Sequence, residues 1–303
     1  MTSSTTDLVL LTEKRFESHT GTNLVSRNVQ DEATRLKAAL EDRGIQNKRV
    51  DWSRADFDWT TASHCLFRTT WDYFDRWQEF STWLENVKTK TTLINSADII
   101  QWNTDKHYLA DLKAKGCPTI PTHYIPQSSK DSILDIASKV DAQEVVIKPT
   151  VSGAGRHTYR HTKASLSGFE KTFESLNSHE DFMIQPFLPD ILEHGEVTLV
   201  LFDGKFSHAI RKTAGANEFR IQDDHGGSVH HHKATQDEID CAEQAFSACK
   251  EVPVYGRVDM VRGFDGKPKI MELELVEPEL WLRFDDNAAG RFAEAIKKRL
   301  FRD

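Results

Sequence analysis

The sequence predicts an α/β and α+β fold, with a parallel α/β N-terminal lobe at residues 1–95 and two α+β lobes at 96–185 and 186–303. Three observations support this division. Short apolar runs alternate with helical patterns over the first lobe, which is typical of a parallel sheet. A glycine-containing loop interrupts the mixed region that follows. Two Asp-Gly turns between alternating strands then indicate an antiparallel sheet in the last lobe.

The first lobe is expected to begin with a buried strand at residues 8–11. Apolar residues at spacings of four, three and four predict a helix that ends at Gly44: Val29, Ala33, Leu36 and Leu40. Further strands are expected at 48–50, 65–68 and 92–94, and a second helix carries Trp77, Phe80, Leu84 and Val87. Parallel sheets present ligands at the carboxyl ends of their strands, so Arg68, Asp72 and Tyr73 are candidate substrate contacts. An aromatic core around Trp71 is the alternative.

The central lobe is expected to open with a helix from Asn103 to Lys115 that Asn103 caps. Strands follow at 119–125, 145–148, 157–159 and 182–185, with helices at 133–140 and 166–176. Lys148 precedes the loop Ser152-Gly153-Ala154-Gly155-Arg156, where glycines let backbone N–H groups surround an anion. An ordinary hairpin is the alternative. Residues 183–189 contain two prolines, which suit either a nucleotide-binding hinge or a plain connector between lobes.

The last lobe contains the hairpin around Asp203-Gly204, in which a two-residue turn places Glu196 opposite Arg211. Helices are expected at 237–249 and from about Asp286 to the end. His230-His231-His232 invites a metal interpretation, but consecutive residues of an extended chain point to opposite sides. A polar loop is the simpler interpretation.

The second hairpin, around Asp265-Gly266, carries the strongest signal for chemistry. A two-residue turn places Asp259 opposite Glu272 and Arg257 opposite Glu274, all on one face. Three neighbouring carboxylates repel one another unless a cation lies between them, and oxygen ligands without Cys or His suit Mg²⁺. The alternative is a solvated polar face of the sheet.

Composition limits the possible partners and location. The net charge of −8, from 39 basic and 47 acidic residues, argues against nucleic acid as the main partner. The four scattered cysteines are expected to be free thiols in a reducing cytoplasm. Residues 1–7 lack the basic region of a signal peptide, and no apolar run reaches membrane-spanning length. We expect a cytoplasmic protein without a membrane partner.

Taken in order, these pieces resemble the ATP-grasp superfamily, which includes D-alanine–D-alanine ligase and bacterial glutathione synthetase. The resemblance covers nearly the whole chain, and Arg257-Val258-Asp259 with Met271-Glu272-Leu273-Glu274 is its most specific part. Three further stretches are similar to the branch that contains the ring-closing enzyme of D-cycloserine biosynthesis: Arg68 to Tyr73, Trp102 to Lys106 and Glu274 to Pro278. The resemblance implies two α+β lobes that grip ATP.

The resemblance also implies roles for individual residues. Lys106 and Lys148 would hold the nucleotide phosphates, beneath a flexible loop that contains Ser152, Gly153, Gly155 and Arg156. The hinge beside adenine would comprise Gln185, Phe187 and Leu188, with Glu193 or Glu196 at the ribose. Arg211 would contact the γ-phosphate and Arg257 the acyl-phosphate and tetrahedral intermediate. Asp259, Glu272 and Glu274 would bind two Mg²⁺ ions.

The implied activity is transfer of the γ-phosphoryl group to a small-molecule carboxylate, followed by attack of an amine to form an amide-type C–N bond. Two alternatives stay open: intramolecular ring closure of an O-ureidoserine-like amino acid, and a nucleotide-binding protein without catalysis. Many relatives have Asn where this chain has Glu274, and Arg where it has Thr198. The sequence identifies neither the carboxylate nor the amine, nor the oligomeric state, although many relatives are homodimers.

Overall fold

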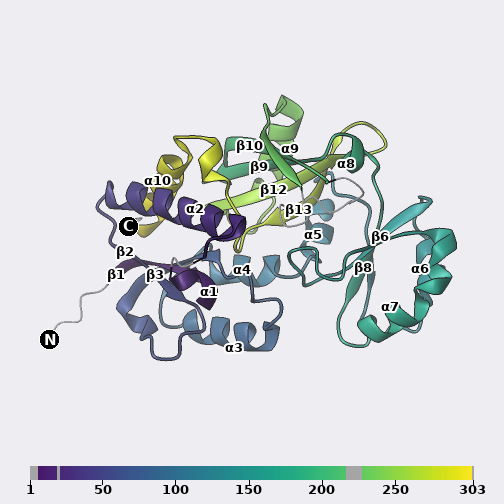
Figure 1. The fold of residues 1–303 in the computed structure, drawn as a ribbon, viewed down its shortest axis with the longest axis horizontal. Coiled ribbons are helices and arrows are strands. Elements are labelled where there is room, and N and C mark those ends of the chain that lie inside the picture. Colours follow the sequence, from purple (N-terminus) through teal and green to yellow (C-terminus); the bar gives the residue numbers. More distant parts are fainter. Residues whose placement is uncertain (1–5, 19–20, 216–226, 302–303) are drawn as a thin grey trace.

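The N-terminal layer is a four-stranded parallel sheet in the order β2-β1-β3-β4, as the alternation of strands and helices predicts (Figure 1). The computed structural model describes residues 6–18, 21–215 and 227–301. The strands of this sheet are β1 (Thr6–Thr12), β2 (Asn47–Asp51), β3 (Ala62–Thr69) and β4 (Thr92–Ile94). Its main helices are α1 (Lys14–Glu17), α2 (Leu24–Glu41) and α3 (Trp77–Val87). The helical spacings read from the sequence are therefore confirmed.

The third part of the chain forms a five-stranded antiparallel sheet in the order β11-β10-β9-β12-β13. Its strands are β9 (Glu196–Phe202), β10 (Lys205–Thr213), β11 (Ser228–His231), β12 (Tyr255–Arg262) and β13 (Pro268–Glu274). The helices of this part are α8 (Asp190–Glu193), α9 (Gln236–Ser247), the short 3-10 helix η4 (Leu282–Phe284) and α10 (Ala288–Leu300). Two of the three consecutive histidines lie in the edge strand β11, so the expected polar loop is wrong there.

A smaller antiparallel sheet, in the order β5-β8-β6-β7, lies at one end of the molecule with α6 and α7 on its far side (Figure 1). Its strands are β5 (His123–Ile125), β6 (Glu144–Pro149), β7 (Tyr159–Thr162) and β8 (Phe182–Pro186). Its helices are α6 (Ile133–Ser138), the 3-10 helix η2 (Lys163–Gly168) and α7 (Glu170–Asn177). The strand expected at 157–159 is shifted to β7, and the helix expected at 166–176 is divided between η2 and α7.

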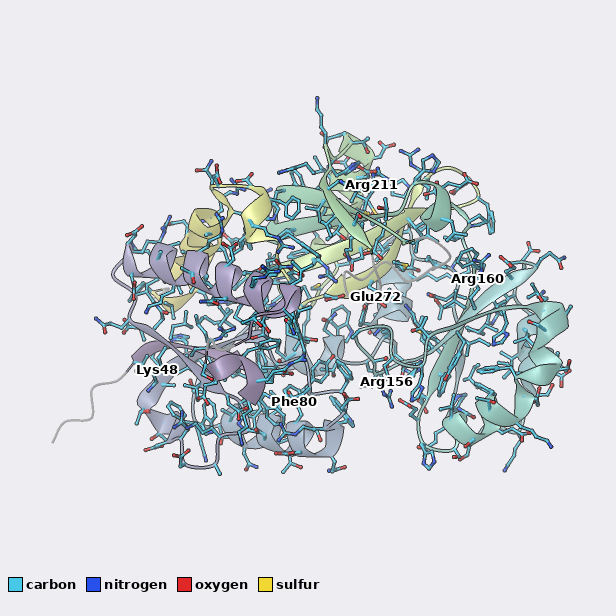
Figure 2. All side chains as sticks on the ribbon, viewed as in Figure 1. Lys48, Phe80, Arg156, Arg160, Arg211 and Glu272 are labelled. Atoms are coloured by element: carbon cyan, nitrogen blue, oxygen red, sulfur yellow. The ribbon has the colours of Figure 1, made fainter. Side chains whose placement is uncertain are left out.

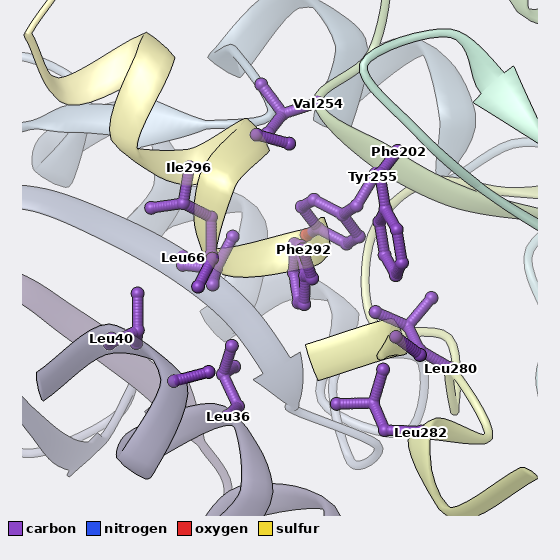
Figure 3. Packing of buried hydrophobic residues seen from close by; sticks show 14 of the residues in the cluster. Leu36, Leu40, Leu66, Phe202, Val254, Tyr255, Leu280, Leu282, Phe292 and Ile296 are labelled. Atoms are coloured by element: carbon purple, nitrogen blue, oxygen red, sulfur yellow. The ribbon is translucent and has the colours of Figure 1, made fainter. Parts of the chain in front are cut away.

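One apolar core joins the first and third sheets. Leu36 and Leu40 of α2 belong to the same buried cluster as Phe292 of α10 and Tyr255 of β12 (Figure 3). Phe292 stacks on Phe202 with ring centroids 4.8 Å apart. Burial of each such side chain stabilises the folded state by roughly 1.5–3 kcal/mol. The shared core therefore fixes the two sheets against each other.

The segment that carries Lys106 differs from the sequence prediction. Instead of one helix from Asn103 to Lys115, the structure has α4 (Ala97–Asn103) and α5 (Tyr108–Ala114), joined by a turn. Ser96 caps α4. The Asn103 amide donates to the carbonyl of Leu273 and accepts from the amide of Leu275, at 2.8 and 2.7 Å. Asn103 thus satisfies buried backbone groups beside β13. The prediction that it caps a helix is wrong.

The β12–β13 hairpin has the predicted residue pairs at the end away from its turn. Arg257 lies opposite Glu274, and Asp259 lies opposite Glu272. The turn itself is wider than predicted, because the amide of Gly263 donates to the carbonyl of Lys267. A bulge after Asp259 adds one residue to β13 and restores the expected register.

The β9–β10 hairpin departs from its prediction for the same kind of reason. Lys205 pairs with Phe202 as a two-residue turn requires, but a bulge between Phe206 and His208 shifts the rest by one residue. Glu196 therefore lies opposite Lys212. The predicted pairing of Glu196 with Arg211 is wrong.

The four cysteines are free thiols, as expected, and all four are buried. Among the described residues, none of the helices has both the length and the apolar composition that a membrane span requires.

Candidate functional site

A cavity of about 810 Å³ lies where the three sheets meet. Most of the residues singled out from the sequence line it: Tyr73, Lys106, Lys148, Ser152, Gly153, Gly155, Arg156, Gln185, Phe187, Leu188, Glu196, Arg257, Asp259, Glu272 and Glu274. Figure 2 shows Glu272 and Arg156 near the junction of the sheets, whereas Arg211 lies farther out on the C-terminal sheet. The structure thus gathers residues 200 positions apart into one site.

The floor of the cavity is the polar face of β12 and β13. The guanidinium of Arg257 donates to both oxygens of Asp259, at 3.0 and 2.9 Å, and to Glu274 at 2.5 Å. Burial alone would raise the pKa of Asp259, but the charges of Arg257 and Lys212 outweigh it and lower that pKa. Asp259 is therefore held as a carboxylate.

Lys212 completes this floor, and the sequence analysis missed it. Its ammonium contacts Glu196 and lies 3.5 Å from Asp259. Burial raises the pKa of Glu196 to about 7, with the charge of Asp259 adding to the shift. Lys212 lies one position beyond Arg211, and the bulge after Phe206 brings it opposite Glu196 in place of Arg211.

Arg211 itself points elsewhere. Its guanidinium donates to the carbonyl of His194 at 2.6 Å and lies 3.2 Å from the ring of His232. Arg211 does not line the cavity, so the structure does not place it beside a nucleotide. Glu193 is an exposed residue of α8 outside the cavity wall, which leaves Glu196 as the cavity-lining member of the pair considered for the ribose.

Two lysines from the central part of the chain face Glu272 across the cavity. Lys148, near the end of β6, donates to Glu272 at 2.7 Å. Lys106 lies 3.9 Å from the same carboxylate and donates to the carbonyl of Ser152 at 2.6 Å. Burial alone would raise the pKa of Glu272, but the charges of Lys106 and Lys148 lower it to about 2. These lysines are the basic groups that an anionic ligand would meet.

The glycine loop closes against the N-terminal lobe. A Cβ atom added to Gly153 would lie 2.5 Å from the ring of Phe74, so glycine is required for this approach. Arg156 forms two hydrogen bonds with Glu180, at 2.8 and 2.9 Å, and lies 3.7 Å from Asp75. The loop therefore covers one side of the cavity.

The hinge after β8 forms an apolar end of the cavity. Phe187 and Leu188 are buried there, next to Val146 and Ile120. The amide of Phe187 donates to the carbonyl of Glu144, so this N–H is not free for a ligand. A flat heterocycle fits such an apolar wall.

Two of the three expected substrate contacts serve the protein instead. Arg68 forms a buried ion pair with Glu32 and does not line the cavity. Asp72 accepts from Trp52 at 2.7 Å and from Arg76 at 2.6 Å, also outside the cavity wall. Tyr73 does line the cavity.

The N-terminal lobe contributes further wall residues that the sequence analysis did not identify as site residues. They include Arg15, Phe16, Trp71, Phe74 and Asp75. Glu277 and Trp281 follow β13 and line the same part of the cavity. Their contribution depends on contacts between lobes, which local sequence patterns do not reveal.

The donor set of Asp259, Glu272 and Glu274 fits a hard divalent cation, since all their ligand atoms are carboxylate oxygens. Each of the three carboxylates is paired with Arg257 or Lys148. Within the described residues, no group of three or more His, Cys, Asp or Glu side chains is already arranged around a metal position. Metal binding would therefore exchange these ion pairs for metal–oxygen bonds.

Comparisons with known proteins bear on this site. Residues 8–95 match the family described as "D-cycloserine synthetase DcsG, N-terminal domain", and residues 112–255 match "Prokaryotic glutathione synthetase, ATP-grasp domain". The chain is 33% identical over 298 residues to the cycloserine biosynthesis protein DcsG of Streptomyces lavendulae, covering 92% of this chain and 97% of that protein.

Solved structures agree. The crystal structure of D-cycloserine synthetase DcsG matches with a TM-score of 0.82 and 30% identity, covering 97% of this chain and 99% of that chain. The D-alanine–D-alanine ligase of Bacillus anthracis, in complex with ATP, matches with a TM-score of 0.66 and 16% identity over 97% of each chain. The similarity to D-alanine–D-alanine ligase supports the fold alone.

Proposed function

This chain belongs to the ATP-grasp superfamily, in the branch that contains D-cycloserine synthetase DcsG, and on that premise we propose that it closes a ring within one amino-acid-like substrate at the cost of ATP. Generic ATP-dependent ligase chemistry follows from the family. The ring closure is the finer part of the proposal. It replaces the joining of two separate substrates, which was the first expectation from the sequence.

One observation carries the proposal: the similarity to DcsG extends through the N-terminal lobe, residues 8–95. This lobe supplies Trp71 and Tyr73, which line the cavity together with the lysines of the central lobe. In a cavity shared by a nucleotide and a second substrate, the walls outside the nucleotide-binding part select that substrate. A substrate similar to O-ureidoserine is therefore the first to test.

The nucleotide would lie between the central and C-terminal lobes. The apolar wall at Phe187 and Leu188 suits adenine, and Lys106 and Lys148 suit the phosphates. When phosphate oxygens replace Glu272 as the partner of Lys148, that carboxylate becomes available to a cation. The negative charge of the phosphate beside Lys148 and the positive charge of the cation beside Glu272 compensate each other.

Asp259, Glu272 and Glu274 are the residues that would hold Mg²⁺, in two sites. Bound there, Mg²⁺ would offset the negative charge that develops during phosphoryl transfer. The protein's own cations add to this, since Arg257 and Lys212 lie beside Asp259. Arg211, which was expected at the γ-phosphate, is replaced in this proposal by Lys212.

The reaction would proceed in two steps. A carboxylate oxygen of the substrate forms a bond to the γ-phosphorus as the bond to the bridging oxygen of ADP breaks. A nitrogen of the same substrate then attacks the acyl carbon, inorganic phosphate leaves, and the nitrogen gives up a proton. The glycine loop, which rests on Phe74, would exclude water from the acyl-phosphate. Positioning and electrostatics suffice for such chemistry, without a side-chain nucleophile.

The test is ADP release with ATP, Mg²⁺ and the D or L form of O-ureidoserine as sole second substrate, with mass spectrometry of the product. Equal amounts of ADP, phosphate and a ring-closed product are expected. ADP release that appears only when a separate amine is added would show a two-substrate ligase instead. Nucleotide binding without release of ADP across a panel of amino acids and small amines would favour a non-catalytic role.

A further inference from the structure

The segment from Val276 to Leu280, which we call the anchored segment, is held by side chains of other elements. Each of its five carbonyls accepts a hydrogen bond. The donors are Tyr255 to Val276 at 2.6 Å, Trp71 to Glu277 at 2.9 Å, Arg68 to Pro278 at 3.0 Å, Arg257 to Glu279 at 3.2 Å and His208 to Leu280 at 2.8 Å. The amide of Leu280 also donates to Glu32 at 3.0 Å.

These bonds fix a stretch without regular secondary structure. The donors come from β3, β10, β12 and the loop after β3, so both the N-terminal and C-terminal lobes hold the segment. Supporting hydrogen bonds of this kind hold irregular backbone in place and so position the side chains that it carries. The side chains so positioned in the cavity wall are those of Val276, Glu277 and Glu279.

Glu277 differs from the other acidic residues of the cavity wall. Those other residues have a basic partner within 4.0 Å: Asp75, Glu196, Asp259, Glu272, Glu274 and Glu279. Glu277 has no such partner among the described residues. Its own backbone amide donates to it, and the charges of Lys106 and Arg257 offset only part of the effect of burial on its pKa.

An unpaired carboxyl group is costly in such a place. Burial raises the pKa of Glu277 to about 8, and the negative charge of Glu274 adds to the shift. A cationic group that enters the cavity would remove this cost, because it would pair with the carboxylate. The chain keeps this unfavourable group at a rigid position in the wall of the cavity, beside Trp71 and Tyr73.

We propose that Glu277 binds the ammonium group of the amino-acid substrate and thereby selects substrates that carry a free amino group. The substrate class rests on the function proposed above. The anchored segment sets the position of Glu277, and Arg68 contributes through Pro278 as a positioning residue.

The consequence is discrimination between amino acids and the same molecules without the amino group. An ammonium–carboxylate pair forms short, charge-assisted hydrogen bonds of about 2.7–2.9 Å. A ligand without the ammonium leaves the Glu277 carboxyl buried and unpaired, and sites built in this way reject such analogues strongly. Discrimination should therefore depend on the carboxylate of Glu277 more than on the shape of the cavity.

The experiment compares O-ureidoserine with its des-amino counterpart, 3-(ureidooxy)propanoate, in the parent protein and in Glu277→Gln. Binding of each compound is measured by calorimetry with a non-hydrolysable ATP analogue and Mg²⁺ present, and turnover is measured by ADP release. Glu277→Gln should weaken binding of the amino compound by about 30-fold or more while it changes binding of the des-amino compound by less than about threefold. In turnover, KM should rise while kcat changes little.

Glu279→Gln is the matched control. It makes the same substitution two residues further along the anchored segment, at a carboxylate that already pairs with Arg283. The ratio of affinities for the two compounds should stay as in the parent protein. Thermal unfolding of both variants shows whether they are folded.

Two outcomes would overturn the proposal: an unchanged ratio in folded Glu277→Gln, or a parent protein that binds both compounds equally. These outcomes are distinct from failure of the proposed function. If the parent discriminates in binding through Glu277 but releases no ADP, the ammonium site stands and ring closure fails. If ADP is released while Glu277→Gln keeps the parental ratio, ring closure stands and the ammonium site fails.

Discussion

The ammonium of Lys212 lies 3.5 Å from the carboxylate of Asp259 and also contacts Glu196, so a buried lysine occupies the place that sequence reasoning assigned to Arg211. Asp259 is one of the three proposed metal ligands. The nearest cations to it are Arg257 and Lys212, and both are buried. This pair of cations is placed to meet negative charge that develops on a transferred phosphoryl group.

Lys212→Met should therefore lower kcat by about 100-fold or more, as removal of a preorganised cation from a site of charge development does. Glu196 can take up a proton when its partner is lost, since its pKa is already about 7, so the variant should fold. Arg211→Met, one position away and outside the cavity, is the control and should change kcat by less than about threefold. A larger loss in Arg211→Met than in Lys212→Met would restore the original assignment.

Glu272→Gln should abolish turnover while leaving the fold intact. The side chain lies in the cavity wall and not in an apolar core, and the change removes a proposed metal ligand without changing its size. Steady-state ADP release and thermal unfolding measure the two effects separately. Glu85→Gln, at an exposed helix position, serves as the control. Turnover within a few-fold of the parent would contradict the metal assignment.

Lys148→Ala should weaken binding of ATP by about tenfold or more, because a charge-assisted bond to phosphate contributes roughly 1.5–3 kcal/mol. The measurement is calorimetry with a non-hydrolysable ATP analogue and Mg²⁺. Lys139→Ala removes an exposed lysine from the same lobe and should leave affinity unchanged. Equal affinities in all three proteins would count against a role of Lys148 at the phosphates.

Gly153→Ala should impair closure of the glycine loop. The added Cβ would lie 2.5 Å from the ring of Phe74, well inside van der Waals contact, so the loop or the ring must move. We expect a fall in kcat/KM for ATP of about tenfold, and a partial recovery in the double variant Gly153→Ala/Phe74→Ala. Steady-state kinetics of the parent, the two single variants and the double variant give the coupling energy between positions 153 and 74. A double variant no better than Gly153→Ala would mean that the contact with Phe74 does not limit closure.

The raised pKa of Glu277 predicts a pH dependence of stability without ligands. The carboxyl group titrates at about 8 when folded and near its ordinary value of 4.5 when unfolded. The folded state therefore binds the extra proton in this window, and stability falls as pH rises from about 4.5 towards 8. Glu277→Gln removes this loss, so its Tm relative to the parent should increase by a few °C between pH 5 and pH 9. A difference in Tm that is constant with pH would contradict the raised pKa.

The sequence was sufficient for the order of the elements and for the acidic face of the β12–β13 hairpin. Alternation determines which residues share a face, and Asp259 lies opposite Glu272 as predicted because the wider turn and the bulge after Asp259 cancel in register. The same reasoning failed at Glu196, because a bulge at Ser207 exchanged Arg211 for Lys212. A bulge leaves no reliable mark in one sequence, since its cause is packing of the strand against its neighbours.

Contacts between lobes were the second feature that the sequence did not predict. Asn103 has the residue type and position of a helix cap, but its amide satisfies backbone groups of β13 and the residue after it. Arg68 ends a parallel strand as a ligand-binding residue would, yet it pairs with Glu32 and holds the carbonyl of Pro278. Both roles depend on partners more than 30 residues away in sequence, which local propensity does not predict.

The anchored segment also ties the N-terminal lobe to the C-terminal lobe. Trp71 and Arg68 of the N-terminal lobe hydrogen-bond to backbone of the C-terminal lobe, next to the apolar core that the two lobes share. Parting these lobes would break all of those bonds together and would also open the apolar core between them. The wall of the cavity that Trp71 and Glu277 share is therefore as rigid as the junction of the two sheets that carry it.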